Sequence, residues 1–489
     1  MTSANRTRLT YVREVTRGVT PASPNMRKMR MTGEGLLARP DFAQSAEIRD
    51  DRMMSDPARV YKETGGTIGF EFSYPVADSP LAEAIANAFQ NDWTGLPARD
   101  NAGVADSVIT NVLASTDTYT VTTGAAFVAG QVILASGFTN SANNGVFVAQ
   151  AGTTATAVVA PAAPGLVDEA VPPGTARLKA VGVQGAAGDI VATASGLTST
   201  TLNFTTLGLS VGQFVKIGGA AAGTQFATAA NNGFARVTSI AANALGLDEL
   251  PTGWGSDTGA TKTIQILVPD FIKNGVTMLT ATIERGFMAH VPPTYLVGVG
   301  MHVDQMKLNM GLKDIIKGEF SFRGLSSPLP STTSLDDTPM DETTDPVMTA
   351  NVDVTRVTLD GATAVGPNWL QSVELTLNNN LRAIDAIGSD TAVDIAAGEC
   401  AVSLKTEVIF GDKTSVDAFL AGTPLRASFA MKKAGRGVII HFPRMIRMNG
   451  GNPNATAKNT DVKMSMEAMA SKDAATSAHI IMCRFEYLP

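Results

Sequence analysis

The chain has 489 residues, too many for one ordinary hydrophobic core, so about two to four domains are expected. Its net charge of -7 argues against a protein whose task is to grip nucleic acid, because such binding requires clustered Lys and Arg. No apolar run is long enough to cross a bilayer, and residues 1–6 lack the apolar core of a secretory signal, so we expect no membrane span.

The first predicted elements lie between residues 28 and 74. A strand-like run at 28–33 is followed by a long, charged segment, 37–65, that carries few secondary-structure signals. A loop of this length is uncommon inside a compact domain unless it has a function of its own. Residues 67–74 then alternate between apolar and polar side chains, which predicts a half-buried strand.

A short helix is predicted after this strand. Ser79 is a suitable N-cap, and Pro80 occupies the first helical position, where a missing N–H breaks no hydrogen bond. The inward-facing positions are expected to be Leu81, Ile85 and Phe89.

The same order recurs near the C-terminus. Residues 372–377 read as a strand, a long loop passes through Asp390, and residues 402–408 read as a second strand. A short helix capped by Thr414 or Ser415 follows. Its inward-facing positions are expected to be Val416, Phe419 and Leu420. Strand, long loop, strand and helix, present twice, predict a duplicated domain.

Charge density separates the middle of the chain from the rest. Residues 101–260 hold 4 basic and 8 acidic side chains, and this low charge predicts an inserted domain. Asn-Gly follows a short apolar strand twice, at Asn144 and at Asn232, and predicts hairpins with type I′ turns. We therefore expect two small β-units, at about 105–180 and 190–260, each with its own core. The core centres are expected to be Val132, Phe147, Phe214 and Phe234.

Nothing in the sequence indicates catalysis or cofactor binding. The histidines lie singly, without the spacing of metal ligands, at His290, His302, His441 and His479. No nucleophile-elbow, phosphate-binding or dinucleotide-binding motif is present. Cys400 and Cys483 are expected to be buried or half-buried free thiols. We therefore expect no enzyme, no metal site and no cofactor.

Several predicted strands have one polar and one apolar face. In the first half, Glu71 and Glu319 lie on the face of their strand opposite to the neighbouring phenylalanines. In the second half, the corresponding polar positions are Lys405, Glu407, Lys463 and Glu467. Such alternation determines which face is buried. The polar faces either meet solvent on a monomer or line a water-filled channel formed when sheets of several copies join.

In this order, the features resemble the tail tube proteins, or major tail proteins, of long-tailed bacteriophages of the siphophage type. The resemblance rests on residues 13–24, 32–36, 45–52, 70–74 with the helix after them, 283–287 and 318–324. It covers residues 6–100 and 261–489. It implies a mainly β fold, with a β-sandwich or barrel and a flanking α-helix in each of two tandem tube domains.

The resemblance also implies a domain organisation. A first, discontinuous tube domain is formed by residues 1–104 and 261–330, and a second by residues 351–489. From composition, a linker at 331–350 is expected to join them, and residues 105–260 are expected to form an inserted β-rich decoration region whose role the resemblance does not cover.

The function implied by the resemblance is structural. Rings of tail tube subunits stack into a hollow tube through which phage DNA passes without specific binding. Because the tube domain occurs twice, three chains are expected to form one pseudo-hexameric ring. The side chains expected to face the lumen are Glu71, Glu319, Lys405, Glu407, Lys463 and Glu467. The loop expected to reach the next ring carries Glu47, Arg49, Asp50, Asp51 and Arg52.

The partners implied are other copies of the chain and the tape measure, tail terminator and distal tail proteins of the phage. The location implied is the virion tail, after assembly in the host cytoplasm. The alternative is a host-surface-binding, β-rich tail adhesin or tail-tip protein. That alternative predicts a cluster of exposed aromatic side chains in the insert, whereas its aromatic residues occupy positions that look like core.

Overall fold

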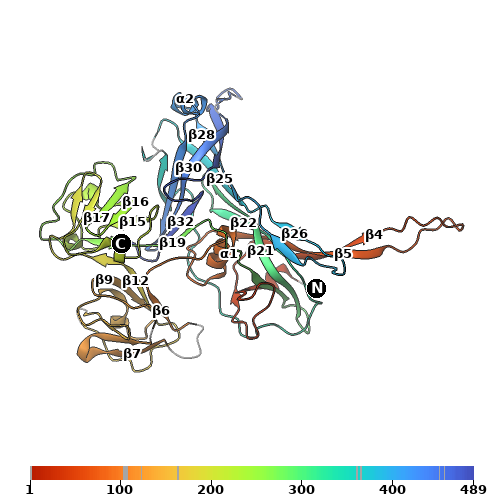
Figure 1. Ribbon diagram of the computed structural model, residues 1–489, viewed down its shortest axis with the longest axis horizontal. Coiled ribbons are helices and arrows are strands. Elements are labelled where there is room, and N and C mark those ends of the chain that lie inside the picture. Colours follow the sequence, from red (N-terminus) through yellow and green to blue (C-terminus); the bar gives the residue numbers. More distant parts are fainter. Residues whose placement is uncertain are drawn as a thin grey trace.

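The computed structural model describes residues 3–102, 108–122, 124–161, 165–359, 362–363, 366–450, 452–455 and 457–489. This part of the chain is mainly β, with two α-helices, α1 (Pro80–Phe89) and α2 (Thr414–Leu420), which confirms the predicted fold class. Figure 1 shows a β-rich region at one end of the long axis, a projecting hairpin at the other, and the two halves of the repeat between them.

Both halves of the repeat are built from antiparallel strands. Those of the first half are β1 (Thr7–Arg13), β2 (Arg27–Lys28), β3 (Gly33–Glu34), β4 (Leu37–Ala43), β5 (Ala58–Glu71), β20 (Ala281–Phe287), β21 (Thr294–Gly311) and β22 (Lys317–Gly324). Those of the second half are β23 (Val354–Leu359), β24 (Ala362–Thr363), β25 (Leu370–Asn378), β26 (Arg382–Ile384), β27 (Asp394–Ala396), β28 (Ala401–Ile409), β29 (Leu425–Lys433), β30 (Arg436–Gly450), β31 (Lys463–Ala470) and β32 (Ile481–Phe485).

One sheet runs through both halves without interruption. Following the strand pairs, its order is β4–β5–β22–β21–β25–β28–β31–β30. The two halves are joined by the pairing of β21 with β25, in which Met306 lies opposite Leu377. One face of this sheet is apolar and buried, with Phe70, Phe320 and Leu404 in a single core cluster that spans both halves.

Matching irregularities identify equivalent strands in the two halves. In β21 the register shifts between Val303 and Gln305, and in β30 it shifts between Arg447 and Asn449. These positions differ by the same 144 residues (447 minus 303 and 449 minus 305). β21 is therefore the counterpart of β30, β22 of β31 and β5 of β28, as the predicted duplication requires.

Helix α1 forms where the sequence predicts it. The hydroxyl of Ser79 accepts a hydrogen bond from the Ala82 N–H, and Pro80 is the first helical residue. Ile85 and Phe89 are buried in the core cluster, and Leu81 packs at its margin. The helix therefore covers the apolar face of the first-half strands.

Helix α2 differs from the prediction. Its N-cap is Lys413, without a side-chain cap, rather than Thr414 or Ser415. No residue of α2 is buried, and Leu420, expected to face inward, is 77% exposed. Figure 1 places α2 at an extremity of the molecule, where little of the chain is available to cover it.

The segment from 37 to 65 is a hairpin and not an irregular loop, which corrects the sequence-based expectation. β4 pairs with the first part of β5 from Leu37 opposite Gly65 to Ala43 opposite Ala58. The sequence signal is weak because β4 and the outer part of β5, residues 58–63, are exposed or half-buried and carry charges, and β4 contains Pro40. We call residues 37–65 the arm and residues 44–57 its tip. The run at 28–33, predicted as one strand, forms strand only at its two ends, in β2 and β3.

Residues 98–267 form the β-rich region. Its strands are β6 (Ala98–Asp100), β7 (Ile109–Leu113), β8 (Thr118–Val121), β9 (Gln131–Ser136), β10 (Gly145–Val148), β11 (Ala157–Val159), β12 (Arg177–Gln184), β13 (Val191–Thr193), β14 (Gly196–Thr198), β15 (Phe214–Ile217), β16 (Phe234–Ala241), β17 (Ala244–Asp248) and β18 (Gln265–Leu267). β6 and β18 both pair with β12, so the chain enters and leaves this region along one strand. Two separate buried clusters, one around Tyr119 and one around Phe204, lie on either side of it in sequence.

The two Asn-Gly sites are not type I′ turns. The side-chain amide of Asn144 exchanges two hydrogen bonds with the backbone of Phe138, both 2.9 Å long. Asn232 makes the same pair with Phe226, at 2.8 and 2.9 Å, and both residues lie 88 positions later (232 minus 144 and 226 minus 138). Each asparagine therefore closes a long connection that contains a 3-10 turn. The repeated Asn-Gly sequence correctly indicated two equivalent units, although it did not indicate the turn type.

The predicted core centres of the insert are largely wrong. Phe147 packs against the first unit's cluster, but Val132 and Phe214 are buried against the second half of the repeat, beside Ile439 and Phe485. Phe234 packs at the margin of the same junction. The two unit cores instead contain Tyr119, Ile133 and Phe138, and Phe204, Val215 and Phe226. β9 and β15 are buried on both faces, so periodicity alone could not tell which face was the unit core.

A second part of this junction is charged. β19 (Asp270–Lys273) leaves the insert and pairs with β32, where Asp270 lies opposite Arg484. The carboxylate of Asp270 lies 2.7 Å from Lys179 Nζ and 3.0 Å from Arg484 Nη2, and all three side chains are nearly inaccessible. Burial opposes ionisation of Asp270, but the two cations outweigh it and lower the pKa of the carboxyl. Three distant segments of the chain thus meet in one buried ion cluster.

Candidate assembly surfaces

The arm projects from the first half, and its tip is exposed (Figure 1). All five charged residues predicted for the stacking loop lie in this tip with exposed side chains; they are Glu47, Arg49, Asp50, Asp51 and Arg52. Arg49 and Asp51 pair with each other, with Arg49 Nε 3.0 Å from Asp51 Oδ1, and this hydrogen bond lowers the pKa of Asp51. The tip also exposes large apolar side chains that the sequence analysis did not single out: Ile48, Met53 and Met54. An exposed apolar tip on an extended hairpin is suited to insertion into another surface.

The six residues predicted to share a polar sheet face lie on β5, β22, β28 and β31 of the continuous sheet. They alternate with the buried residues of the same strands, and each is exposed or half-buried. Lys405, Glu407, Lys463 and Glu467 lie together on two adjacent strands, while Glu71 and Glu319 lie on the other pair. We call this the polar sheet face.

Three further charged residues lie on the polar sheet face and were missed by the sequence analysis: Lys307, Lys317 and Glu374. These residues can be recognised only once the strand register is known, because each lies directly opposite a residue of opposite charge. Lys307 pairs with Glu319, Lys317 with Glu71, and Glu374 with Lys405. Lys405 also lies opposite Glu467.

The polar sheet face is therefore mixed in charge and close to neutral. The nine charged residues named above comprise five glutamates and four lysines, a net charge of -1 (4 minus 5), and Arg323 adds one positive charge on the same face of β22. Lys463 Nζ lies 3.3 Å from Glu407 Oε2, an exposed ion pair of small energetic worth. Opposite charges in cross-strand register leave no run of lysines that could hold a polyanion.

The sheet has free edges in the single chain. At one end, β3 and β4 pair with β5 on one side. At the other, the last part of β30 pairs with β31 on one side. By the equivalence of the halves, the edge of β3 and β4 corresponds to β25, and the edge of β30 corresponds to β21. Inside the chain, β25 and β21 pair with each other. Unpaired strand edges are templates for pairing with another chain.

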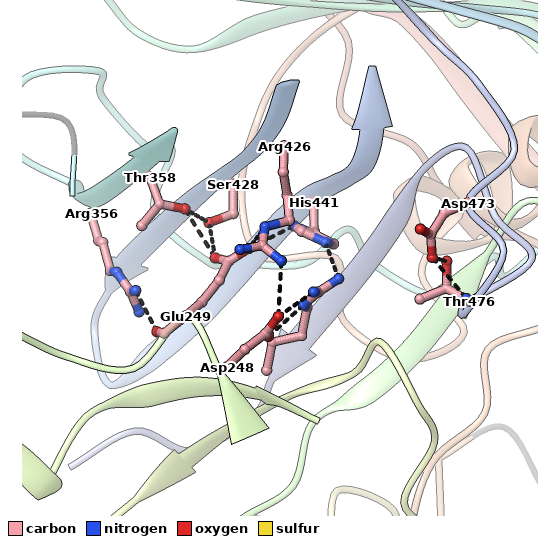
Figure 2. A network of polar contacts seen from close by, with 10 residues as sticks. Asp248, Glu249, Arg356, Thr358, Arg426, Ser428, His441, Asp473 and Thr476 are labelled. Carbon is pink, nitrogen blue, oxygen red and sulfur yellow. Dashed lines mark hydrogen bonds and ion pairs between the residues drawn. The ribbon is translucent and has the colours of Figure 1, made fainter. Parts of the chain in front are cut away.

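The β-rich region is held against the second half by a polar network shown in Figure 2. Asp248, at the end of β17, accepts hydrogen bonds from Arg236 at 2.8 Å and from Arg426 at 2.9 Å. The carboxylate of Glu249 is fully buried and accepts from Thr358 and Ser428, both at 3.0 Å. The insert therefore contacts β23, β29 and β30 through a buried polar network, in addition to its covalent connections.

His441 lies inside this network and carries no sign of a chemical role. It is fully buried, with Arg236 Nη1 3.2 Å from its Nε2. Burial, and then the charges of Arg236 and Arg426, lower the pKa of His441 well below its usual value. The imidazole is therefore neutral at physiological pH and serves as a packing and hydrogen-bonding group.

Within the described residues, no group of three or more His, Cys, Asp and Glu side chains is arranged to hold a metal ion. Cys400 and Cys483 are free thiols, as predicted, and burial raises their pKa values to about 11 and about 12. Neither α-helix in the described part of the chain has the length and hydropathy needed to cross a membrane.

Comparison with known families decides the identity. The family profile described as "Phage tail tube protein" matches the chain twice, over residues 4–240 and 219–470. The chain belongs to the phage tail tube protein family. The double match agrees with the duplicated strand–helix plan, so this tail tube protein carries two tandem domains of the family. A search of curated proteins found no significant match to this chain. A tail tube protein is a structural component of the phage tail, so the site to be explained in this one is an assembly surface.

Proposed function

We propose that this tail tube protein forms trimeric, pseudo-hexameric rings that stack into a hollow tube for the passage of phage DNA. The observation that carries the proposal is the continuous sheet, in which the β21–β25 pairing joins one half to the next. The free end of β30 is equivalent to β21, and the edge of β3 and β4 is equivalent to β25. The same antiparallel pairing between successive chains would close the sheet into a ring and remove both free edges.

The dimensions of such a ring suit DNA. Counting β3 and β4 as one, the path contains eight strands per chain, so three chains supply 24 (3 times 8). Strands about 4.8 Å apart with a tilt near 40° then give a backbone diameter of roughly 48 Å. Inward side chains reduce this to about 40 Å, and a duplex is about 20 Å wide.

The ring size is the first test. Image reconstruction of tubes assembled from the purified protein should give three chains per ring, with a near-sixfold inner wall. The measurement is the symmetry and mass per ring. Six chains per ring, or a protein that stays monomeric at all concentrations, would contradict the proposal.

The polar sheet face is proposed as the lumen wall, with Glu71, Glu319, Lys405, Glu407, Lys463 and Glu467 facing the DNA. Its near-neutral, paired charges support this placement, because DNA must slide past without being retained. The apolar face of the same strands is already covered by α1 and the core. The insert at 105–260 would then lie outside the wall, since a channel of this width cannot hold it.

Replacing Glu71 and Glu319 with Lys should slow DNA ejection without preventing tube formation. Each replacement changes the charge by two, so a trimeric ring gains 12 positive charges (2 times 2 times 3), and added cations hold phosphates by releasing counterions. Ejection rates should fall at low salt and recover as salt is raised. The neutral pair Glu71→Gln and Glu319→Gln is the control and should behave as the unmodified protein. Equal rates for the Lys and Gln variants would remove these residues from the lumen.

The remaining proposals follow from tube assembly. The partners would be other copies of the chain and the tape measure, tail terminator and distal tail proteins, and assembly would take place in the host cytoplasm before incorporation into the virion. The division into 1–104 with 261–330, 105–260, 331–350 and 351–489 stays a prediction. The adhesin alternative is less well supported, because every aromatic side chain of the insert is buried or half-buried.

A further inference from the structure

The two halves differ most in the loop that follows the first strand of each repeat. In the first half this loop is the arm, built from β4 and the outer part of β5. In the second half the counterpart is residues 379–400, between β25 and β28, which fold into the small β26–β27 hairpin. Figure 1 shows β26 beside the root of the arm. We call residues 379–400 the second loop.

The base of the second loop is fixed to the first half by buried groups. The side-chain amide of Asn379 donates to the carbonyl oxygens of Ala88 and Val303, both at 2.9 Å, and Asn379 is 2% exposed. The N–H of Leu381 donates to Asp304 Oδ1 at 2.8 Å. The direction in which this loop leaves the sheet is therefore set by contacts within the same chain.

The middle of the second loop lies against the arm itself. The N–H of Lys62, on the arm part of β5, donates to the Asp390 carbonyl oxygen at 2.8 Å. Arg59 Nη2 lies 2.7 Å from the Asp390 carboxylate, and burial together with the nearby Asp385 carboxylate raises the pKa of Tyr61 to about 12. Three successive parts of one arm strand thus contact the second loop through backbone and side-chain bonds.

The far end of the second loop is also held. Arg17 lies 2.7 Å from the Asp394 carboxylate and donates a further hydrogen bond to the Ile395 carbonyl oxygen. At its base, its middle and its end, the loop is occupied by contacts within the chain. The arm tip differs in its contacts, since the hydrogen bonds and ion pair of residues 44–57 all lie within the tip. Both segments expose apolar side chains, with Ile48 99% exposed in the arm tip and Ile387 108% exposed in the second loop.

We infer that duplication has divided one stacking role into two: the arm alone reaches a copy of the chain in the next ring, and the second loop braces the arm. This inference rests on the proposed tube assembly and adds the symmetry of the contacts between neighbouring rings. A trimeric ring then presents three arms and not six, so neighbouring rings are connected with threefold symmetry around a nearly sixfold wall. Bonding to both the sheet and the arm root fixes the direction of the arm before stacking, which lowers the ordering cost of the contact.

Crosslinking the brace tests this inference. Cysteines replace Arg59 and Asp390 in a Cys400→Ser background, and a short bis-maleimide joins them in the purified subunit. Since the second loop keeps its place on stacking, crosslinked subunits should elongate within about twofold of the rate of uncrosslinked ones. Each single-cysteine variant, treated with the same reagent, is the control. Crosslinked subunits that cannot elongate while the controls do would show that the second loop must swing out to the next ring.

A measurement on the free subunit separates this inference from the proposed function. Replacing residues 382–396 with a short Gly-Ser linker should speed amide exchange at Lys62 by tenfold or more and leave α1 unchanged. Unchanged exchange at Lys62 would overturn the brace even if tubes form. Failure of the unmodified protein to form tubes, with Lys62 protected, would instead overturn the proposed function and with it the three-arm symmetry.

Discussion

A subunit without the arm tip should fold normally and fail to elongate into tubes. Ala43 and Ala58 are register partners in the arm, so residues 44–57 can be replaced by a two-residue Asn-Gly turn that suits a hairpin. The deletion removes no buried residue and leaves β5 paired with β22 in the core sheet. Circular dichroism and thermal unfolding should match those of the full chain, while light scattering shows no growth.

The apolar part of the tip can be tested without shortening the chain. Changing Ile48, Met53 and Met54 to Ser keeps the hairpin and removes three large exposed apolar side chains. Burial of each at a ring contact contributes about 1.5–3 kcal/mol, so the critical concentration for assembly should rise by at least about 100-fold. Neutralising the charged pair with Arg49→Gln and Asp51→Asn is the control and should have a much smaller effect. Normal growth of the shortened subunit would mean that the arm does not connect rings.

Loss of the Asp270 carboxylate should be among the most destabilising single changes in the chain. Asp270→Ala leaves the ammonium of Lys179 and the guanidinium of Arg484 buried without their counter-ion. Breaking one partner of a buried ion pair costs about 3–5 kcal/mol. We expect a lower midpoint of denaturant unfolding, together with faster amide exchange in β19 and β32, since these strands are paired at this residue.

Two control variants show whether charge is the cause. Converting the whole cluster with Asp270→Leu, Lys179→Met and Arg484→Met removes every unpaired ion and should restore much of the stability. Asp314→Asn breaks the exposed pair of Asp314 with Lys317 and should leave the midpoint unchanged. If Asp270→Ala behaves like Asp314→Asn, the cluster does not hold the insert and the C-terminal strand together.

Local chemistry explains what could be predicted from the sequence. Ser79 and Pro80 specify the start of α1 by hydrogen bonding and by a fixed backbone angle, which depend on no distant residue. The alternation around Phe70 and Phe320 indicates a buried face, because the pleat sends neighbouring side chains to opposite sides. The polar sheet face was predictable for the same reason, although its charge pairing required the register.

Features that depend on distant partners could not be read from the sequence. The arm strands pair with each other and are held by the second loop, and their side chains are largely exposed or half-buried, so no hydrophobic period reveals them. Val132 and Phe214 look like unit cores because they are apolar, and only the placement of Ile439 and Phe485 shows that they form a junction. The brace depends on Asp390, one exposed carboxylate in a loop of low sequence signal.

The pairing of strands far apart in the sequence has a consequence for biosynthesis. Leu9 in β1 lies opposite Arg285 in β20, and Asp270 in β19 lies opposite Arg484 in β32, 214 residues further along the chain (484 minus 270). The ribosome must release β32 before β19 can pair with it. Folding with such long loops to close is slow, and the edge of β30 that we propose for ring closure exists only once the second half has folded. The chain order thereby delays competence for the proposed self-association until the second half has been synthesised.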